Sequence, residues 1–259
     1  ASPGPLASST GKNLIGMGVG GPSDWDQWRM YADVARVFRL IQDSNGNAIP
    51  AEDARIDSTG MPLLTDFRMI VAHDPTSMHG RYRIRFRGKV SSMAPLLGGT
   101  LTPTNDGGSD VGSWGAAFIG GYTYARFDWA DAGGSSIWFT FAGAYRDAGG
   151  TQPGIAEFSM MRPVTPGGTT SYAFGTLFTN EAIAFARHFD VLRWMDFTRT
   201  VGSQVQNWTD RGDPRYVSQA YQPGLAQLGA NPNTNVWGTP VRPGAYEDII
   251  RFSNAAGVD

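Results

Sequence analysis

Three groups of residues combine tryptophan, aspartate and arginine, which are side chains suited to binding sugars. They are Asp24 and Trp25; Arg193 and Asp196; and Trp208, Asp210 and Arg211. A tryptophan ring offers a flat apolar face to a sugar ring, and aspartate and arginine can hydrogen-bond its hydroxyl groups. If the groups meet in space, they predict a carbohydrate-binding cleft. The alternative is an internal Arg–Asp network that braces a long loop.

A stripe of arginines runs through residues 81–87 (RYRIRFR), where arginine alternates strictly with large apolar residues. The stripe consists of Arg81, Arg83, Arg85 and Arg87. This period of two predicts a strand with one apolar face and one charged face. The charged face could bind an acidic polysaccharide or a partner molecule. We favour the solvated face of an antiparallel sheet, on which arginines pair with carboxylates.

The composition excludes several kinds of site. The chain has 259 residues, of which three are histidine and none is cysteine. The absence of cysteine excludes disulfides, thiolate zinc sites and cysteine nucleophiles. A net charge of −2 gives no electrostatic footprint for nucleic acid, and no membrane span is evident. Residues 105–110 (NDGGSD) offer oxygen ligands but lack the closing glutamate of a complete calcium loop. We expect a turn there and no cofactor, with calcium as the alternative.

The beginning of the chain predicts one β/α unit after a flexible arm at residues 1–12. An apolar run at residues 13–19 predicts a buried strand, and a Gly-Gly-Pro turn follows it. Ser23 is a helix-capping residue, and apolar residues then recur at helical spacing. We therefore predict a helix over residues 24–38 and assign residues 13–45 to a first barrel-like unit.

The middle of the chain, residues 46–170, predicts an inserted antiparallel β-sandwich that is jelly-roll-like. Residues 43–60 are expected to be loop. Strands are expected at residues 81–87, 116–119, 122–129, 137–142 and 155–161, separated by glycine-rich turns.

Residues 171–259 return to an α/β pattern and predict further barrel-like units. A helix is expected from Thr179 or Asn180 to about Phe189, and then a strand at residues 191–197. A long polar loop spans residues 200–243, and a last helix covers residues 244–256 with Gly257 as its C-cap. The predicted fold class is therefore α+β: partial (β/α) barrel units with an inserted sandwich.

Several segments resemble a family of secreted, mostly bacterial glycoside-hydrolase-like proteins. The matching residues are 18–25 (GVGGPSDW), 57–62 (DSTGMP), 80–82 (GRY), 192–197 (LRWMDF), 208–211 (WTDR) and 246–254 (YEDIIRFSN). The resemblance implies a (β/α)₈ barrel interrupted by a β-sandwich after its first unit. It also implies that the Trp, Asp and Arg groups named first line the cleft at the C-terminal ends of the barrel strands.

The same resemblance implies that both catalytic carboxylates lie beyond Asp259, so we expect no catalytic residue in this chain. Asn180-Glu181 is the one Asn-Glu pair that could be mistaken for a catalytic motif, and we interpret it as the start of a helix. A retaining glycosidase needs two carboxyl groups about 5–5.5 Å apart. We therefore expect the native polypeptide to continue past Asp259, a partner chain to complete it, or the fragment to serve another purpose.

Two functions follow as expectations, and whether the protein is an enzyme stays open. The first is the N-terminal part of a carbohydrate-active extracellular protein, which binds a polysaccharide or cell-surface glycan without catalysis by this chain. The second is a non-catalytic structural or adhesive subunit, in a filament, sheath, capsid or surface layer, that assembles with copies of itself. Both place the protein outside the cell or at its surface.

Overall fold

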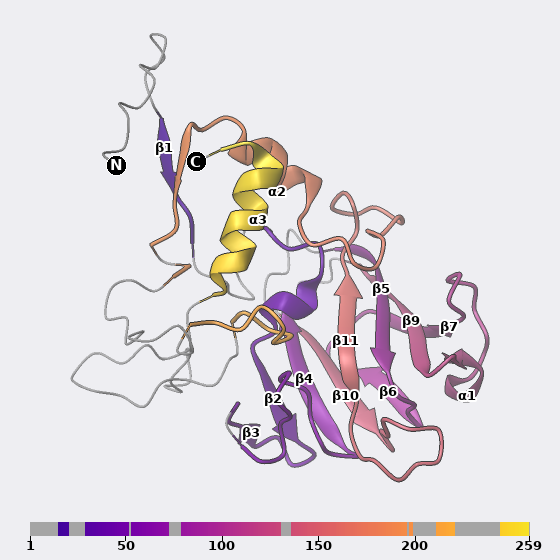
Figure 1. Cartoon of the computed structure of the whole chain (residues 1–259). Coiled ribbons are helices and arrows are strands. Elements are labelled where there is room, and N and C mark those ends of the chain that lie inside the picture. Colours follow the sequence, from indigo (N-terminus) through magenta and orange to yellow (C-terminus); the bar gives the residue numbers. More distant parts are fainter. Residues whose placement is uncertain are drawn as a thin grey trace.

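The computed structural model describes residues 15–20, 29–51, 53–72, 79–130, 136–195, 197–198, 211–220 and 244–258. Within these ranges the fold is a mixed α+β arrangement that is mostly β-sheet, with few helices and no closed barrel (Figure 1). The predicted arm at residues 1–12 lies outside the described residues. No described helix combines the length and the apolar character needed to cross a membrane.

The first antiparallel sheet has five strands in the order β3-β2-β4-β10-β6. They are β2 (Leu40–Asp43), β3 (Ala48–Ile49), β4 (Phe67–Ala72), β6 (Ser92–Pro95) and β10 (Ile137–Ala142). The residues of β10 alternate between buried and partly exposed, as the period of two predicts. β2 belongs to this sheet although we expected residues 13–45 to form a barrel unit, and β3 lies within the expected loop at residues 43–60.

The second antiparallel sheet has the order β11-β5-β9-β7, with β8 paired to β9. Its strands are β5 (Gly80–Arg87), β7 (Thr100–Thr104), β8 (Phe118–Ile119), β9 (Tyr122–Trp129) and β11 (Ala156–Met161). The strand expected at residues 116–119 is wrong in its first half, because Ser113 caps a one-turn helix, α1 (Trp114–Ala117). Its hydroxyl oxygen accepts a hydrogen bond from the Ala116 amide at 3.3 Å.

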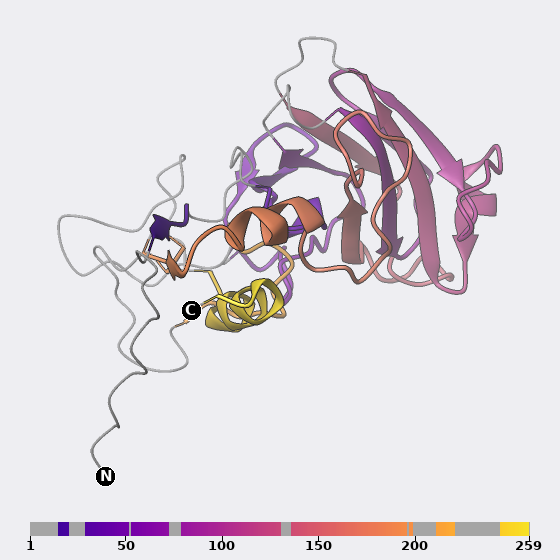
Figure 2. The same cartoon turned by 90° about the horizontal axis from the view of Figure 1, so that it is seen from above.

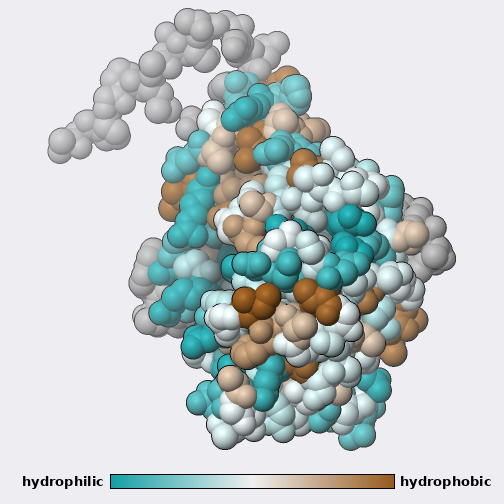
Figure 3. Space-filling view, turned by 90° about the vertical axis from the view of Figure 1, so that its right-hand side faces the viewer, coloured by the Kyte–Doolittle hydropathy of each residue, from teal (hydrophilic) through white to brown (hydrophobic). Residues whose placement is uncertain are grey.

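The two sheets pack their apolar faces together in a sandwich-like arrangement. Phe127 of β9 meets Phe139 of β10 edge to face with ring centroids 5.1 Å apart. Phe86 of β5 meets Phe141 of β10 in the same way at 5.8 Å. All four rings are almost completely buried. The outer surface differs, and the side shown in Figure 3 has small hydrophobic patches separated by hydrophilic surface.

A separate two-stranded parallel sheet lies beyond the sandwich. It pairs β1 (Gly16–Gly18) with β12 (Val191–Arg193), with Met17 opposite Leu192. Helices α2 (Asn180–Ala186) and α3 (Tyr246–Ala256) lie side by side between this sheet and the sandwich (Figure 2). Both helices match the sequence pattern: Thr179 caps α2, and Gly257 ends α3 in the left-handed conformation at φ 70°.

The helix expected over residues 24–38 is wrong for the residues that the structure describes. Only a short 3₁₀ helix, η1 (Val34–Val37), is present, and residues 21–28 lie outside the described ranges. Arg29 has φ 52°, which a helix does not allow, and Tyr31 and Asp33 form bridges with Phe178 and Met161. The apolar residues of this segment are buried on every side, so their helical spacing did not reflect a single buried face.

A buried polar cluster attaches α3 to η1 and to residues 211–220. The Tyr31 hydroxyl donates to Asp248 Oδ2 at 2.8 Å, and Arg36 Nη2 donates to the same oxygen at 2.6 Å. Arg36 Nη1 also donates to the carbonyls of Pro214 and Tyr216, each at 3.0 Å. Burial, and next the charge of Asp248, raises the pKa of Tyr31 well above its usual value. The cluster joins three segments that are far apart in the sequence.

Candidate functional site

The sugar-binding residues predicted from the sequence fall mostly outside the described part of the chain. Those outside it are Asp24, Trp25, Asp196, Trp208 and Asp210. Two are described, and they have different partners. Arg193 ends β12, is exposed and donates to Met195 Sδ at 3.1 Å. Arg211 pairs with Glu247 in the first turn of α3. The Arg211 pair fits the bracing alternative, since it ties residue 211 to a helix.

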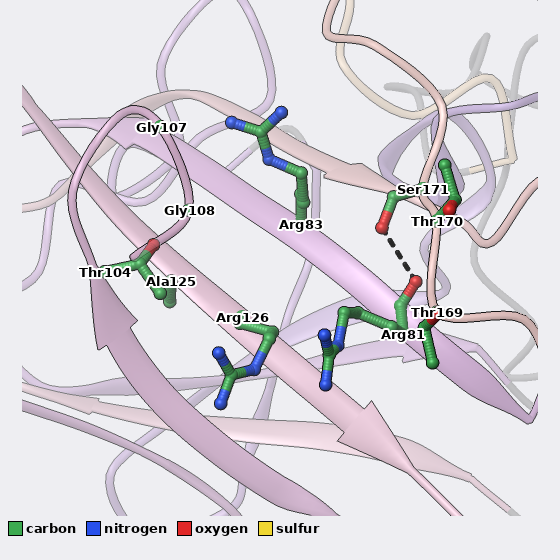
Figure 4. Close-up of a pocket in the computed structure, with 10 residues that line it drawn as sticks. All are labelled: Arg81, Arg83, Thr104, Gly107, Gly108, Ala125, Arg126, Thr169, Thr170 and Ser171. Carbon is green, nitrogen blue, oxygen red and sulfur yellow. Dashed lines mark hydrogen bonds between the residues drawn. The ribbon is translucent and has the colours of Figure 1, made fainter. Parts of the chain in front are cut away.

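A pocket lined entirely by described residues lies elsewhere, on the outer face of the second sheet (Figure 4). Its volume is about 270 Å³. Arginines from β5 and β9 line it together with hydroxyl side chains from β7 and from the segment after β11. The lining residues are Arg81, Arg83, Thr104, Gly107, Gly108, Ala125, Arg126, Thr169, Thr170 and Ser171. We call this site the arginine pocket.

Strand pairing and two backbone contacts position the walls of the arginine pocket. β9 lies between β5 and β7, so side chains at alternate positions of all three strands share one face. The segment at residues 168–171 is held against β5, because the Arg81 amide donates to the Gly168 carbonyl at 2.9 Å and Ser171 Oγ donates to the Arg81 carbonyl at 2.8 Å. The hydroxyl wall therefore has a fixed position relative to the arginines.

One side of the pocket is an arginine–aspartate network. Arg81 Nε donates to Asp128 Oδ1 at 2.6 Å, and Arg126 Nε donates to Asp128 Oδ2 at 2.8 Å. Arg126 Nη1 also donates to Asp110 Oδ1 at 2.6 Å. Burial raises the pKa of Asp128, but hydrogen bonds from Arg81 and Arg126 outweigh it and hold this pKa below its ordinary value. Asp128 is therefore ionised at neutral pH, and its carboxylate is shared by Arg81 and Arg126.

Arg83 forms the other side of the pocket and has no carboxylate partner within the described ranges. Its Nη2 donates to the Asp106 carbonyl at 2.6 Å, and its guanidinium carbon lies 5.0 Å from the centroid of the Phe174 ring. In the strand register, Arg83 stands directly opposite Arg126. Figure 4 shows the guanidinium groups of Arg81 and Arg126 close together, with that of Arg83 across from them.

Arginines and aromatic rings extend this surface along β5. The Arg85 guanidinium carbon lies 4.6 Å from the Phe174 ring centroid and 5.1 Å from that of Tyr122. Arg85 Nε is buried with no hydrogen-bond partner. Arg87, at the end of the strand, instead pairs with Glu157 at 3.4 Å. The expectation of arginines paired with carboxylates is thus confirmed for Arg81 and Arg87, whereas Arg83 and Arg85 stack on aromatic rings.

Residues 105–110 form a turn beside this pocket. Asn105 Oδ1 accepts a hydrogen bond from the Ser109 amide at 2.9 Å, and Asp110 is engaged by Arg126. Across the residues that the structure describes, no three His, Cys, Asp or Glu side chains gather as a metal site would require. The calcium alternative therefore gains no support from this turn.

The arginine pocket offers binding chemistry: several guanidinium donors, hydroxyl groups that donate and accept, and one uncompensated positive charge. The sequence pattern identified Arg81 and Arg83 as part of the stripe, but it did not identify Arg126, Thr104 or residues 169–171. Arg126 could have been found from the alternation in β9, which places it on the same face as Asp128. Comparisons with protein-family models, curated proteins and solved structures give no match for this chain.

Proposed function

We propose that this chain is the polysaccharide-binding front portion of a carbohydrate-active, glycoside-hydrolase-like protein that works outside the cell or at its surface. The observation that carries the proposal is the parallel pairing of β1 with β12. The whole sandwich lies between these strands in the sequence, α2 precedes β12, and α3 follows it. Strand, helix, parallel strand and helix is the order of consecutive β/α units, and it agrees with the resemblance seen in the sequence.

The parallel pair also suggests where sugar would bind. Because β1 and β12 run in the same direction, both strands finish at the same end of their small sheet, and we call this end its C-terminal edge. The segment after β1 contains Asp24 and Trp25, and the segment after β12 contains Asp196. Among the residues predicted from the sequence to bind sugar, Arg193 is described at this edge, and it is exposed. In α/β barrels, this edge is where substrates bind.

Affinity gel electrophoresis against a panel of neutral and acidic polysaccharides tests the proposal. We expect at least one polysaccharide to retard the protein and Arg193→Ala to weaken that retardation several-fold. The matched control is Arg187→Ala, which removes an exposed arginine from the end of α2 that donates to the Ala255 carbonyl. We expect no release of reducing sugar by this chain. Failure of every polysaccharide to retard the protein would refute the proposal.

One observation favours the second function, a self-assembling structural subunit. Large apolar side chains are exposed at the β1–β12 pair and on α2: Ile15 next to β1 is 56% exposed, Val191 of β12 is 41% exposed, and Phe185 of α2 is 47% exposed. A short sheet with open edges and apolar neighbours is a site where another copy can bind. If this function holds, light scattering at rising protein concentration will show oligomers, and Val191→Lys will abolish them.

A further inference from the structure

We propose that the arginine pocket binds a negatively charged oxygen group, either the carboxylate of a uronic acid or the sulfate ester of an acidic polysaccharide. The polysaccharide part rests on the function proposed above, whereas binding of the anion itself does not. The pocket lies on the sandwich, so it is a second binding site, separate from the edge of the β1–β12 sheet.

The first argument is the strand register. Arg83 and Arg126 are direct cross-strand neighbours. Like charges placed opposite each other on adjacent strands destabilise a sheet. Asp110 and Asp128 compensate the charges of Arg126 and Arg81. Arg83, by contrast, donates only to a backbone carbonyl and stacks on an aromatic ring. An anion in the pocket would supply the missing negative charge.

The second argument is the set of donors left over. Arg83 uses one Nη2 hydrogen for the Asp106 carbonyl, so four of its five N–H donors remain for a ligand: the Nε hydrogen, both Nη1 hydrogens and the second Nη2 hydrogen. Guanidinium groups bind carboxylate and sulfate through paired hydrogen bonds, with geometry that lysine does not provide. Thr169 and Thr170 line the pocket with hydroxyl groups. Arginine can bind the charged group of an acidic sugar, and the threonine hydroxyl groups can hydrogen-bond its ring. This combination suits an acidic sugar better than a bare ion.

The third argument concerns size and surroundings. A pocket of about 270 Å³ is near the lower limit of small-molecule sites, roughly 300–1,000 Å³, so it suits one sugar residue. The Arg85–Phe174–Tyr122 stack continues the surface beyond the pocket. Aromatic faces and a further unpaired arginine can contact the next sugar of a polymer. We infer that the pocket holds one charged residue of an acidic chain.

The test compares three polymers with one backbone: dextran, carboxymethyl-dextran and dextran sulfate. Binding is measured by calorimetry for the whole chain and for Arg83→Gln, Arg83→Lys and Arg87→Gln. Arg87 is the matched control, because it lies on the same strand face and carries the same charge but is paired with Glu157 outside the pocket. In parallel, thermal unfolding is followed in sodium sulfate, and Arg83→Gln in the same salt controls for the general stabilisation that sulfate gives to proteins.

We expect dextran to bind at least tenfold more weakly than one of the charged polymers. Arg83→Gln should reduce the binding of that polymer about tenfold, Arg83→Lys should restore only part of it, and Arg87→Gln should change it less than twofold. The preferred polymer identifies the group as carboxylate or sulfate. Sulfate should raise the melting temperature more for the unaltered chain than for Arg83→Gln.

Two results would overturn the inference. The first is that Arg83→Gln and Arg87→Gln weaken polymer binding equally and that single-stranded DNA binds the protein as tightly as dextran sulfate does. That result would show attraction to any polyanion. The second is equal stabilisation of both proteins by sulfate together with no preference for charged dextran. If sulfate stabilises the protein through Arg83 but no polysaccharide binds, the pocket is an anion site and the proposed polysaccharide function fails.

Discussion

Asp248 is predicted to be the most sensitive ionisable residue in the described part of the chain. Its side chain is completely buried, whereas that of its partner Arg36 is 14% exposed. Asp248→Asn removes the charge but keeps the shape and an oxygen that can accept from the Tyr31 hydroxyl. The substitution also removes the counter-charge of Arg251, which lies 3.5 Å away, but Arg251 is 58% exposed and stays hydrated, so the main effect is to leave the buried Arg36 without a counter-charge.

The size of the expected loss in unfolding free energy depends on the contacts that Arg36 keeps in the variant. Removing one partner of a buried ion pair typically costs about 3–5 kcal/mol, because the remaining charge stays buried. Arg36 keeps the Pro214 and Tyr216 carbonyls as acceptors, so its guanidinium is not wholly unsatisfied. We therefore expect the lower limit of that range, about 3 kcal/mol of lost unfolding free energy.

Urea unfolding followed by tryptophan fluorescence and circular dichroism measures this loss. The control is Asp53→Asn, which breaks a more exposed pair with Arg55 at 2.8 Å and should cost about 0–1 kcal/mol. Adding Arg36→Met to Asp248→Asn should recover about 1–3 kcal/mol, since it removes the buried charge. The reasoning is refuted if Asp248→Asn costs no more than the control, or if the two substitutions at residues 36 and 248 simply add.

Three further predictions concern stability. Gly60 and Gly175 have φ of 88° and 89°, but a Cβ at Gly60 would lie 2.4 Å from the Tyr216 ring, whereas nothing lies within 4 Å at Gly175. Gly175→Ala should cost about 1–2 kcal/mol and Gly60→Ala about 1–3 kcal/mol more in urea unfolding; equal losses would mean that Tyr216 moves aside. Arg162 is buried with two nitrogens unbonded, and burial lowers its pKa to about 10, so Arg162→Met should leave the melting temperature unchanged or raise it; a clear fall would contradict this. Burial raises the pKa of Asp57, but hydrogen bonds from backbone amides and a hydroxyl group outweigh this effect and hold the pKa below its ordinary value. Ionised Asp57 therefore stabilises the fold at any pH above the pKa of the unfolded chain, and this stabilisation is lost as pH falls through the lower pKa of the folded chain. Urea unfolding from pH 5 to pH 3 should therefore show a smaller loss of stability for Asp57→Asn than for the unaltered chain. Equal losses would contradict the lowered pKa of Asp57.

Strands and helices with one buried face were predictable from the sequence. The ranges expected for β9 and β10 match the structure, because every second residue of each strand is buried. α2 begins where Thr179 accepts a hydrogen bond from the Ala182 amide at 3.1 Å. In these elements the local signal and the tertiary environment agree, so hydrophobic period and capping residues are enough to locate them.

Prediction failed where burial has no single face or where the partner strand is remote. Residues 31–38 are buried almost throughout, and apolar residues then recur at spacings of three and four without an α-helix. Asp33 instead accepts hydrogen bonds from the Ala35 amide at 3.0 Å and from the Met160 amide at 2.8 Å, which fixes an extended approach to β11. β2 pairs with β4 in the first sheet, and its own sequence pattern does not reveal which strand it joins.

The arginine pocket follows from the core of the sandwich. Phe86 of β5 and Phe127 of β9 are completely buried, which fixes the register of the two strands. A slip of one residue in β9 would turn Arg126 into the core and Phe127 out to solvent, at a cost that no surface contact could offset. The register that buries the aromatic residues therefore forces Arg83 to stand opposite Arg126. A sequence pattern can identify the face of each strand, but the pairing that brings these two charges together depends on the folded core.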